Sequence, residues 1–193
     1  MNAEIKILKL LLNNREEKFT IKKIAERAKI NYRIAYEKVS QMEKGGLIKV
    51  TKIGNTKICE LTNKFDKSVF EAEYGRRTDL LNNKDFLVLY KRLSELQFSF
   101  VALLFGSYAK RKTNKHSDID LLTIGGDEKE IRSTISLWPE KIHLISVTYK
   151  DFIHMAKSRE FTVVSEAIKN NIILVGIEEY YRLMSNANTK RNS

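Results

Sequence analysis

The sequence predicts an α+β protein of two domains, a basic helical domain that ends in a hairpin and a C-terminal domain in which strands and helices mix. Three observations predict this organisation. Apolar residues recur at helical spacing in three segments before residue 45, strand-like runs flank a Gly-Asn turn at residues 54–55, and two buried-strand patterns enclose a polar stretch within residues 100–124. A chain of 193 residues with 42% apolar side chains can bury two such cores.

The formal charge of +11 is concentrated in the first third of the chain. Residues 1–62 hold 14 Lys and Arg residues against 7 Asp and Glu residues, whereas the remainder holds 21 against 17. A lysine-rich surface can serve solubility alone, but this asymmetry favours a polyanionic partner. No apolar run approaches the ~20 residues that span a bilayer, and charges interrupt the apolar N-terminal segment, unlike a signal peptide. We therefore expect a cytoplasmic protein that does not associate with membranes.

Three helices are expected in the first 45 residues. The first covers residues 3–12, where Ile and Leu repeat at helical spacing. Thr20 is expected to cap a short second helix, and Asn31 a third helix that ends at Gly45. A very short turn joins the second and third helices, which is typical of a helix-turn-helix.

A hairpin follows, with the Gly-Asn pair at residues 54–55 as its two-residue turn. Placing Ile53 opposite Thr56 fixes the register of the two strands. That register pairs Ile48 with Leu61, Lys49 with Glu60, Val50 with Cys59, and Lys52 with Lys57. Lys52 and Lys57 form a like-charge pair, which is unfavourable unless an anion lies nearby.

Residues 1–62 resemble a winged helix-turn-helix domain of bacterial and archaeal transcription regulators. The pattern FTIKKIAERAKINYRIAYEKVSQMEKGGLIKV, followed by the charged two-stranded wing, carries this resemblance. It implies that the third helix enters the DNA major groove and that the wing touches the backbone or the minor groove. Double-stranded DNA is thus the expected partner, although some winged domains bind protein instead.

The candidate DNA contacts follow from helical geometry and from the wing. With Ala35, Val39 and Met42 as the buried stripe of the third helix, the opposite side faces the groove. The groove-facing candidates are Tyr32, Arg33, Tyr36 and Ser40, and the wing candidates are Lys49, Lys52, Asn55 and Lys57. Any single lysine among them could be merely solvated, whereas the set favours phosphate contacts.

Residues 63–83 mix isolated apolar residues with charges, which predicts a partly helical linker and leaves homodimer contacts open. The next domain is expected at residues 84–184, beginning with a helix capped by Asp85. Its further elements are expected to be strand FSFVALLF, helical turn SYAKRK, strand IDLLTI, a helix opened by Asp127 and Glu130, strand KIHLISVT, helices DFIHMAKS and FTVVSEAIKNN, strand IILVG and helix IEEYYRLMS. Residues 185–193 are expected to form a disordered tail.

The polar stretch between the first two of these strands carries the chemistry. Gly106 and Ser107 follow a strand, where a glycine lets the backbone approach a bound phosphate. Asp118 and Asp120 stand two apart, so that their carboxylates project from one face. A divalent cation relieves their mutual repulsion, and oxygen ligands beside a phosphate favour Mg²⁺.

This spacing strongly resembles the signature of the minimal nucleotidyltransferases in the polymerase-beta-like superfamily, over residues 84–177. The resemblance implies an α/β domain with a mixed sheet, NTP phosphates at Gly106 and Ser107, and two Mg²⁺ ions bridged by the two aspartates. ATP is the expected nucleotide, and in-line attack by an acceptor hydroxyl would transfer a nucleotidyl group and release pyrophosphate. Lys110 and Lys115 are candidates to neutralise the triphosphate.

The sequence departs from that signature in two places. Active members commonly supply a third carboxylate from the next strand, here KIHLISVT, which has no acid unless Glu140 at its start substitutes. Arg111 stands where the family usually has glycine. His143 and His154 are expected to be surface or packing residues. Losing one metal-binding carboxylate would slow turnover by roughly a thousandfold or more, whereas nucleotide binding would survive better.

The whole sequence predicts a DNA-binding transcriptional regulator whose nucleotidyltransferase-like domain binds Mg²⁺ and an NTP. Transfer of a nucleotidyl group to an acceptor hydroxyl is expected only if catalysis survives the missing acid. Two alternatives stay open: an antitoxin-type minimal nucleotidyltransferase that modifies a protein partner, and a catalytically inactive regulator that senses a nucleotide.

Overall fold

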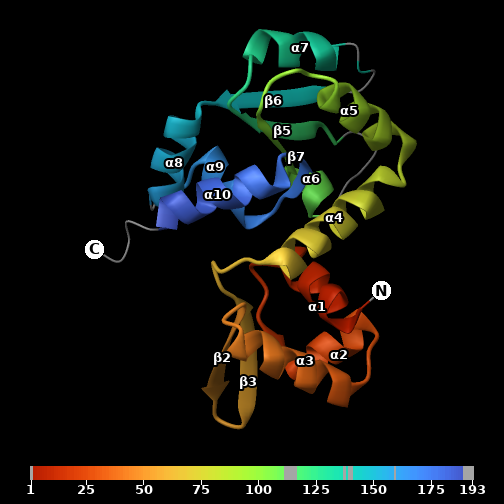
Figure 1. The fold of residues 1–193 in the computed structure, drawn as a ribbon, viewed down its shortest axis with the longest axis vertical. Coiled ribbons are helices and arrows are strands. Elements are labelled where there is room, and N and C mark those ends of the chain that lie inside the picture. The colour runs from red at the N-terminus through yellow and green to blue at the C-terminus, as the bar shows by residue number, and fades with distance from the viewer. Residues whose placement is uncertain (1, 111–116, 137, 139–140, 159, 189–193) are drawn as a thin grey trace. The chain divides into compact units, whose positions relative to one another are not determined.

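The computed structural model describes residues 2–110, 117–136, 138, 141–158 and 160–188 (Figure 1). The chain divides into two compact units, residues 1–75 and 76–193. The boundary falls inside helix α4 (Lys67–Leu81). Residues 63–83, expected as a partly helical linker, thus hold one 15-residue helix that contributes to both units.

The first unit combines three helices with an antiparallel sheet of order β1-β3-β2. Its elements before α4 are α1 (Ala3–Leu12), β1 (Phe19–Thr20), α2 (Ile21–Ala28), α3 (Tyr32–Lys44), β2 (Ile48–Ile53) and β3 (Thr56–Leu61). Both predicted caps are confirmed, because Thr20 Oγ1 accepts a hydrogen bond of 3.1 Å from the Lys23 amide and Asn31 Oδ1 accepts one of 2.8 Å from the Arg33 amide. Lys29 takes a left-handed φ of 52° and closes the short connection between α2 and α3.

The predicted hairpin register is confirmed at every pair, from Ile48 opposite Leu61 to Ile53 opposite Thr56. The sequence does not predict β1, because a strand of two residues shows no recognisable period. β1 pairs with β3 through Phe19 opposite Cys59, and both side chains are fully buried. This third strand fastens the hairpin to the helices of the unit.

The buried position of Cys59 makes its thiol inert. Burial raises the pKa of the thiol to about 11, and the nearby Glu43 carboxylate adds to the shift. At pH 8 about one such thiol in a thousand is ionised, against roughly one in ten for a thiol with the ordinary pKa of 9.0. We therefore expect Cys59 to react with DTNB about 100-fold more slowly in the native protein than in guanidinium. Equal rates would contradict the packing of β1 on β3.

The second unit is built on a four-stranded mixed sheet of order β6-β5-β4-β7. β5 and β6 are parallel, and the other two pairs of strands are antiparallel. The elements after α4 are α5 (Lys84–Ser94), β4 (Val101–Phe105), α6 (Gly106–Ala109), β5 (Ile119–Ile124), α7 (Glu128–Ser136), β6 (Ile142–Val147), α8 (Tyr149–Lys157), α9 (Val163–Lys169), β7 (Ile172–Val175) and α10 (Ile177–Asn188). The α+β class and the mixed sheet agree with the sequence prediction.

One face of this sheet forms the main core of the unit. Leu104, Ile119 and Leu121 lie in a buried cluster with Leu89 of α5 and Ile131 of α7. Because side chains alternate along a strand, the residues between them point to the opposite face. There α9 and α10 contact β4 (Figure 1). Residue 120 therefore projects away from the main core.

Two predictions need correction, one on the cap of a helix and one on the C-terminal tail. Helix α5 is capped by Asn83, whose Oδ1 accepts a 2.8 Å hydrogen bond from the Asp85 amide, so Asp85 lies in the first turn instead of capping it. Asp127 does cap α7, accepting from two amides at 2.8 and 3.1 Å. Residues 185–188 continue α10 and are not a disordered tail, while residues 189–193 lie outside the described part.

None of the described helices is long and apolar enough to cross a membrane.

Candidate functional site

The Gly-Ser turn begins where β4 ends, and its geometry requires glycine. Gly106 has a φ of +67°, in the left-handed region that L side chains rarely adopt. A Cβ added to Gly106 would run into the carboxylate of Asp120. The strand register explains this closeness, because Phe105 pairs directly with Asp120. The two halves of the predicted signature, separated in the sequence, therefore meet in space.

The two aspartates lie at the start of β5. Asp118 precedes the strand, Asp120 is its second residue, and Ile119 between them is fully buried. The side chain of Asp120 is 28% exposed and that of Asp118 is 45% exposed. Both carboxylates are thus accessible; Asp120 is anchored in the strand, and Asp118 stands directly before it.

The neighbouring parallel strand β6 and the residue directly before it present an imidazole and a basic side chain to the two aspartates. Lys141 Nζ donates a 3.1 Å hydrogen bond to Asp118 Oδ2. His143 Nδ1 lies 3.3 Å from Asp120 Oδ1. Strand pairing sets both contacts, since Asp120 is in register with His143 and the Ile119 amide donates to the Lys141 carbonyl at 3.0 Å.

β6 itself holds no carboxylate that could serve as the third acid expected from the resemblance. Residues 142–147, IHLISV, contain no carboxylate, and His143 occupies the place that faces Asp120. Glu140, the suggested substitute, lies outside the described residues, as do Arg111 and Lys115.

Lys110 follows the Gly-Ser turn as the C-cap of α6. Its Nζ donates a 3.0 Å hydrogen bond to Glu166 of α9. The pair is only partly buried, with side-chain exposures of 36% and 33%, so it contributes little to stability. Lys110 therefore lies near the turn, but its ammonium group is paired with the Glu166 carboxylate.

On the first unit, four of the eight expected DNA-contacting residues line one open hollow of about 460 Å³. Its lining residues are Thr20, Ile21, Lys22, Tyr32, Tyr36, Asn55, Thr56 and Lys57. Tyr32 and Tyr36 are 55% and 42% exposed, which is unusual for aromatic side chains in a folded domain. Lys57 Nζ lies 5.1 Å from the centre of the Tyr36 ring and joins the hairpin to α3.

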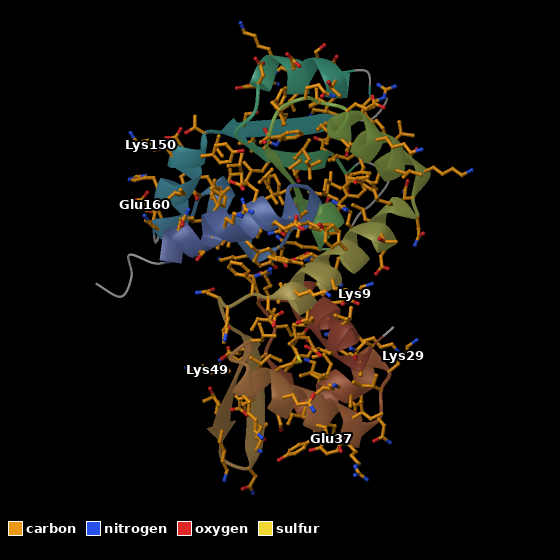
Figure 2. The ribbon with its side chains drawn as sticks, in the orientation of Figure 1. Lys9, Lys29, Glu37, Lys49, Lys150 and Glu160 are labelled. Atoms are coloured by element: carbon orange, nitrogen blue, oxygen red, sulfur yellow. The ribbon has the colours of Figure 1, made fainter. Side chains whose placement is uncertain are left out.

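The remaining expected contacts divide into two groups. Arg33 is highly exposed on α3 and pairs with Glu37 at 3.0 Å, Ser40 is half-buried, and Lys52 is exposed opposite Lys57. Lys49, by contrast, lies at the end of the hairpin away from its turn (Figure 2). Strand alternation puts it on the face opposite to Lys52, and it lines a separate hollow with Arg15. The structure does not group Lys49 with the other candidates.

Comparison with known proteins gives a family match within the second unit. Residues 89–180 match the family model described as polymerase beta, nucleotidyltransferase. The second unit contains a nucleotidyltransferase-like domain. No curated protein matches the chain. A crystal structure of Sso10a-2, a DNA-binding protein from Sulfolobus solfataricus, is similar with 27% identity over 49% of this chain and 96% of that chain, at a TM-score of 0.32, which is too low to establish a common fold.

The nucleotidyltransferase-like domain offers two carboxylates to a divalent cation, Asp118 and Asp120. Carboxylate oxygens are the ligands that Mg²⁺ prefers, and one of these carboxylates touches the Gly106 turn, so the donor set fits. No three His, Cys, Asp or Glu side chains within the described ranges form a group that could hold a metal. Any ion must therefore draw its remaining ligands from the nucleotide, from water or from a rearranged side chain.

Sequence reasoning did not place His143 in the nucleotidyltransferase-like domain's site. It was expected at the surface or in packing, and it is exposed, but its ring lies against Asp120. The signal was present in the sequence, because Lys141 and His143 are two positions apart, as are Asp118 and Asp120. Only the parallel register of β5 and β6 shows that the two pairs face each other.

Proposed function

We propose that the nucleotidyltransferase-like domain binds a nucleoside triphosphate, with ATP the expected one, together with Mg²⁺ at Asp118 and Asp120. The closeness of Gly106 to the Asp120 carboxylate carries this proposal. Because Gly106 has no side chain, the backbone of the turn comes up against the exposed acid pair, so that phosphate oxygens held by a cation at the two acids would lie beside that backbone.

The residues of the chain would divide the work of binding. The backbone of Gly106 and Ser107 would receive phosphate oxygens, and Asp118 and Asp120 would hold the cation. Lys110 would exchange Glu166 for the triphosphate, which costs little because the present pair is partly exposed. A bound Mg²⁺ would neutralise phosphate charge and favour attack by an acceptor hydroxyl.

We further propose that the first unit is a winged helix-turn-helix domain that binds double-stranded DNA, so that the protein is a transcriptional regulator. The support is the hollow between α3 and the β2–β3 hairpin, with its exposed tyrosines and Lys57. In this arrangement α3 would enter the major groove and the hairpin would reach phosphates. The net charge of +7 on residues 1–62 supplies the long-range attraction.

Two outcomes remain for the bound nucleotide, and one experiment separates them. The protein is incubated with Mg²⁺, ATP labelled at the α-phosphate, and candidate protein and nucleic-acid acceptors. Label transfer that is lost in Asp118→Ala/Asp120→Ala supports nucleotidyl transfer. Binding of ATP without transfer supports nucleotide sensing, which the acid-free strand β6 favours. A sensor should also show a DNA affinity that ATP and Mg²⁺ change by roughly fivefold or more.

A further inference from the structure

His143 lies where strand pairing sets it directly across from Asp120, yet it does not belong to the core. Its Nδ1 is 3.3 Å from Asp120 Oδ1, and its side chain is 61% exposed. A cross-strand pair between an imidazole and a carboxylate is one explanation. The position beside the proposed metal site offers another.

We infer that His143 is a nitrogen ligand of the divalent cation held at Asp118 and Asp120. Its imidazole shifts the preference of the site from Mg²⁺ toward first-row transition ions. The inference rests on the proposed function, because it takes the two aspartates as the carboxylate ligands of the ion.

The separation of His143 from Asp120 fits two ligands of one ion. Nitrogen and oxygen donors lie about 2.1 Å from such an ion, and two donors at an angle of ~90–110° are then ~3.0–3.4 Å apart. The observed distance between His143 Nδ1 and Asp120 Oδ1 is 3.3 Å. Both side chains project from paired positions on adjacent strands, so this spacing is set by the sheet.

Asp118 is the third ligand in this inference, and to bind the ion its carboxylate must exchange the hydrogen bond from Lys141 for the ion. The two side chains are 45% and 78% exposed, and ion pairs with this exposure contribute little. The exchange is required, because in the described part of the chain no three potential ligands already form a group. Lys141 is then released beside the ion, where it can face a phosphate.

The chemistry of the donor set decides which ions are favoured. Mg²⁺ prefers oxygen ligands and gives up its waters reluctantly. Imidazole nitrogen suits first-row transition ions better than it suits Mg²⁺, so that replacing a carboxylate by histidine favours those ions over Mg²⁺. Mn²⁺ stands at the weak end of this series and gains least, which makes it a conservative probe. A histidine opposite Asp120, on a strand that holds no acid, therefore changes the metal preference without removing the site.

The test measures metal binding by the full-length protein, with Mn²⁺ as the probe. We expect His143→Ala to bind Mn²⁺ at least tenfold more weakly and to change Mg²⁺ affinity less than threefold, by titration calorimetry. Pulsed EPR of bound Mn²⁺ should show coupling to a ¹⁴N nucleus that disappears in His143→Ala. This coupling separates direct ligation from an indirect effect through Asp120, which also lowers metal affinity.

His154→Ala is the matched control, because it removes an exposed imidazole from α8 of the same unit. It should leave both the affinity and the ¹⁴N coupling unchanged. If His143→Ala retains full Mn²⁺ affinity and the wild type shows no ¹⁴N coupling, while Asp118→Asn/Asp120→Asn abolishes binding, this inference is overturned and the proposed carboxylate site stands. If the wild type binds neither Mn²⁺ nor Mg²⁺, with or without ATP, the metal-dependent proposal itself is overturned.

Discussion

Replacing Gly106 with alanine is expected to lower ATP affinity at least 100-fold while the first unit stays folded. Two independent effects combine at this position. The φ of +67° strains any L side chain by roughly 1–2 kcal/mol. The new methyl group would also collide with the Asp120 carboxylate, so that either the turn or the metal ligand must move. A fluorescent ATP analogue titrated in the presence of Mg²⁺ measures the loss.

Two variants make the Gly106→Ala result interpretable. Gly54→Ala places a methyl group at a φ of +59° with no atom within 4 Å, so it carries the backbone strain without a collision and should leave ATP affinity unchanged. Asp120→Ala relieves the collision, so Gly106→Ala should cost less thermal stability in that background than in the wild type. Normal ATP binding by Gly106→Ala would show that the turn does not hold phosphate.

The double variant Lys52→Ala/Lys57→Ala is expected to bind duplex DNA about 100-fold more weakly. Each phosphate contact releases ~0.9 counterion from the DNA. Losing one contact therefore lowers the affinity nearly tenfold at ~0.1 M salt. The slope of log affinity against log salt should therefore fall by about 2. Fluorescence anisotropy over a series of salt concentrations gives both quantities.

Lys49→Ala is the control for this pair, since it removes one positive charge from the opposite face of the same hairpin. It should change DNA affinity less than threefold. Removing Lys52 and Lys57 relieves a like-charge pair but also removes the cation–π contact of Lys57 with Tyr36, so the double variant should have nearly the same thermal stability as the wild type. An equal loss of affinity in Lys49→Ala would point to general charge attraction rather than to a defined contact surface.

Local patterns predicted the parts of the fold that depend on neighbouring residues. The caps at Thr20 and Asn31 follow from side-chain hydrogen bonds over two or three residues. The hairpin register follows from a two-residue turn and alternation, and Ile53 indeed faces Thr56. The cap of α5 was predicted at Asp85 and lies at Asn83, two residues earlier; both residue types cap helices, and only the backbone conformation decides between them.

What the sequence could not predict depends on pairing between distant segments. β1 is a strand only because Phe19 meets Cys59, and His143 joins the site only because β6 runs parallel to β5. The face of the hairpin on which Lys49 lies could have been deduced from the sequence. The predicted register already paired Lys49 with Glu60, and alternation puts this pair on the face opposite to Val50. The acid pair and the Gly-Ser turn were found because their spacing is characteristic, but their contact through Phe105 and Asp120 is a property of the sheet.

The most direct test of the central claim is the affinity of a nonhydrolysable ATP analogue with and without Mg²⁺, for the wild type and for Asp118→Asn/Asp120→Asn. The substitution keeps the shape of both side chains and removes their charge. We expect Mg²⁺ to strengthen binding of the analogue by ~100-fold in the wild type, because the ion bridges carboxylates and phosphates. That gain should disappear in the variant. Equal affinities for the two proteins in Mg²⁺, or no binding by either, would contradict a metal-dependent nucleotide site at Asp118 and Asp120.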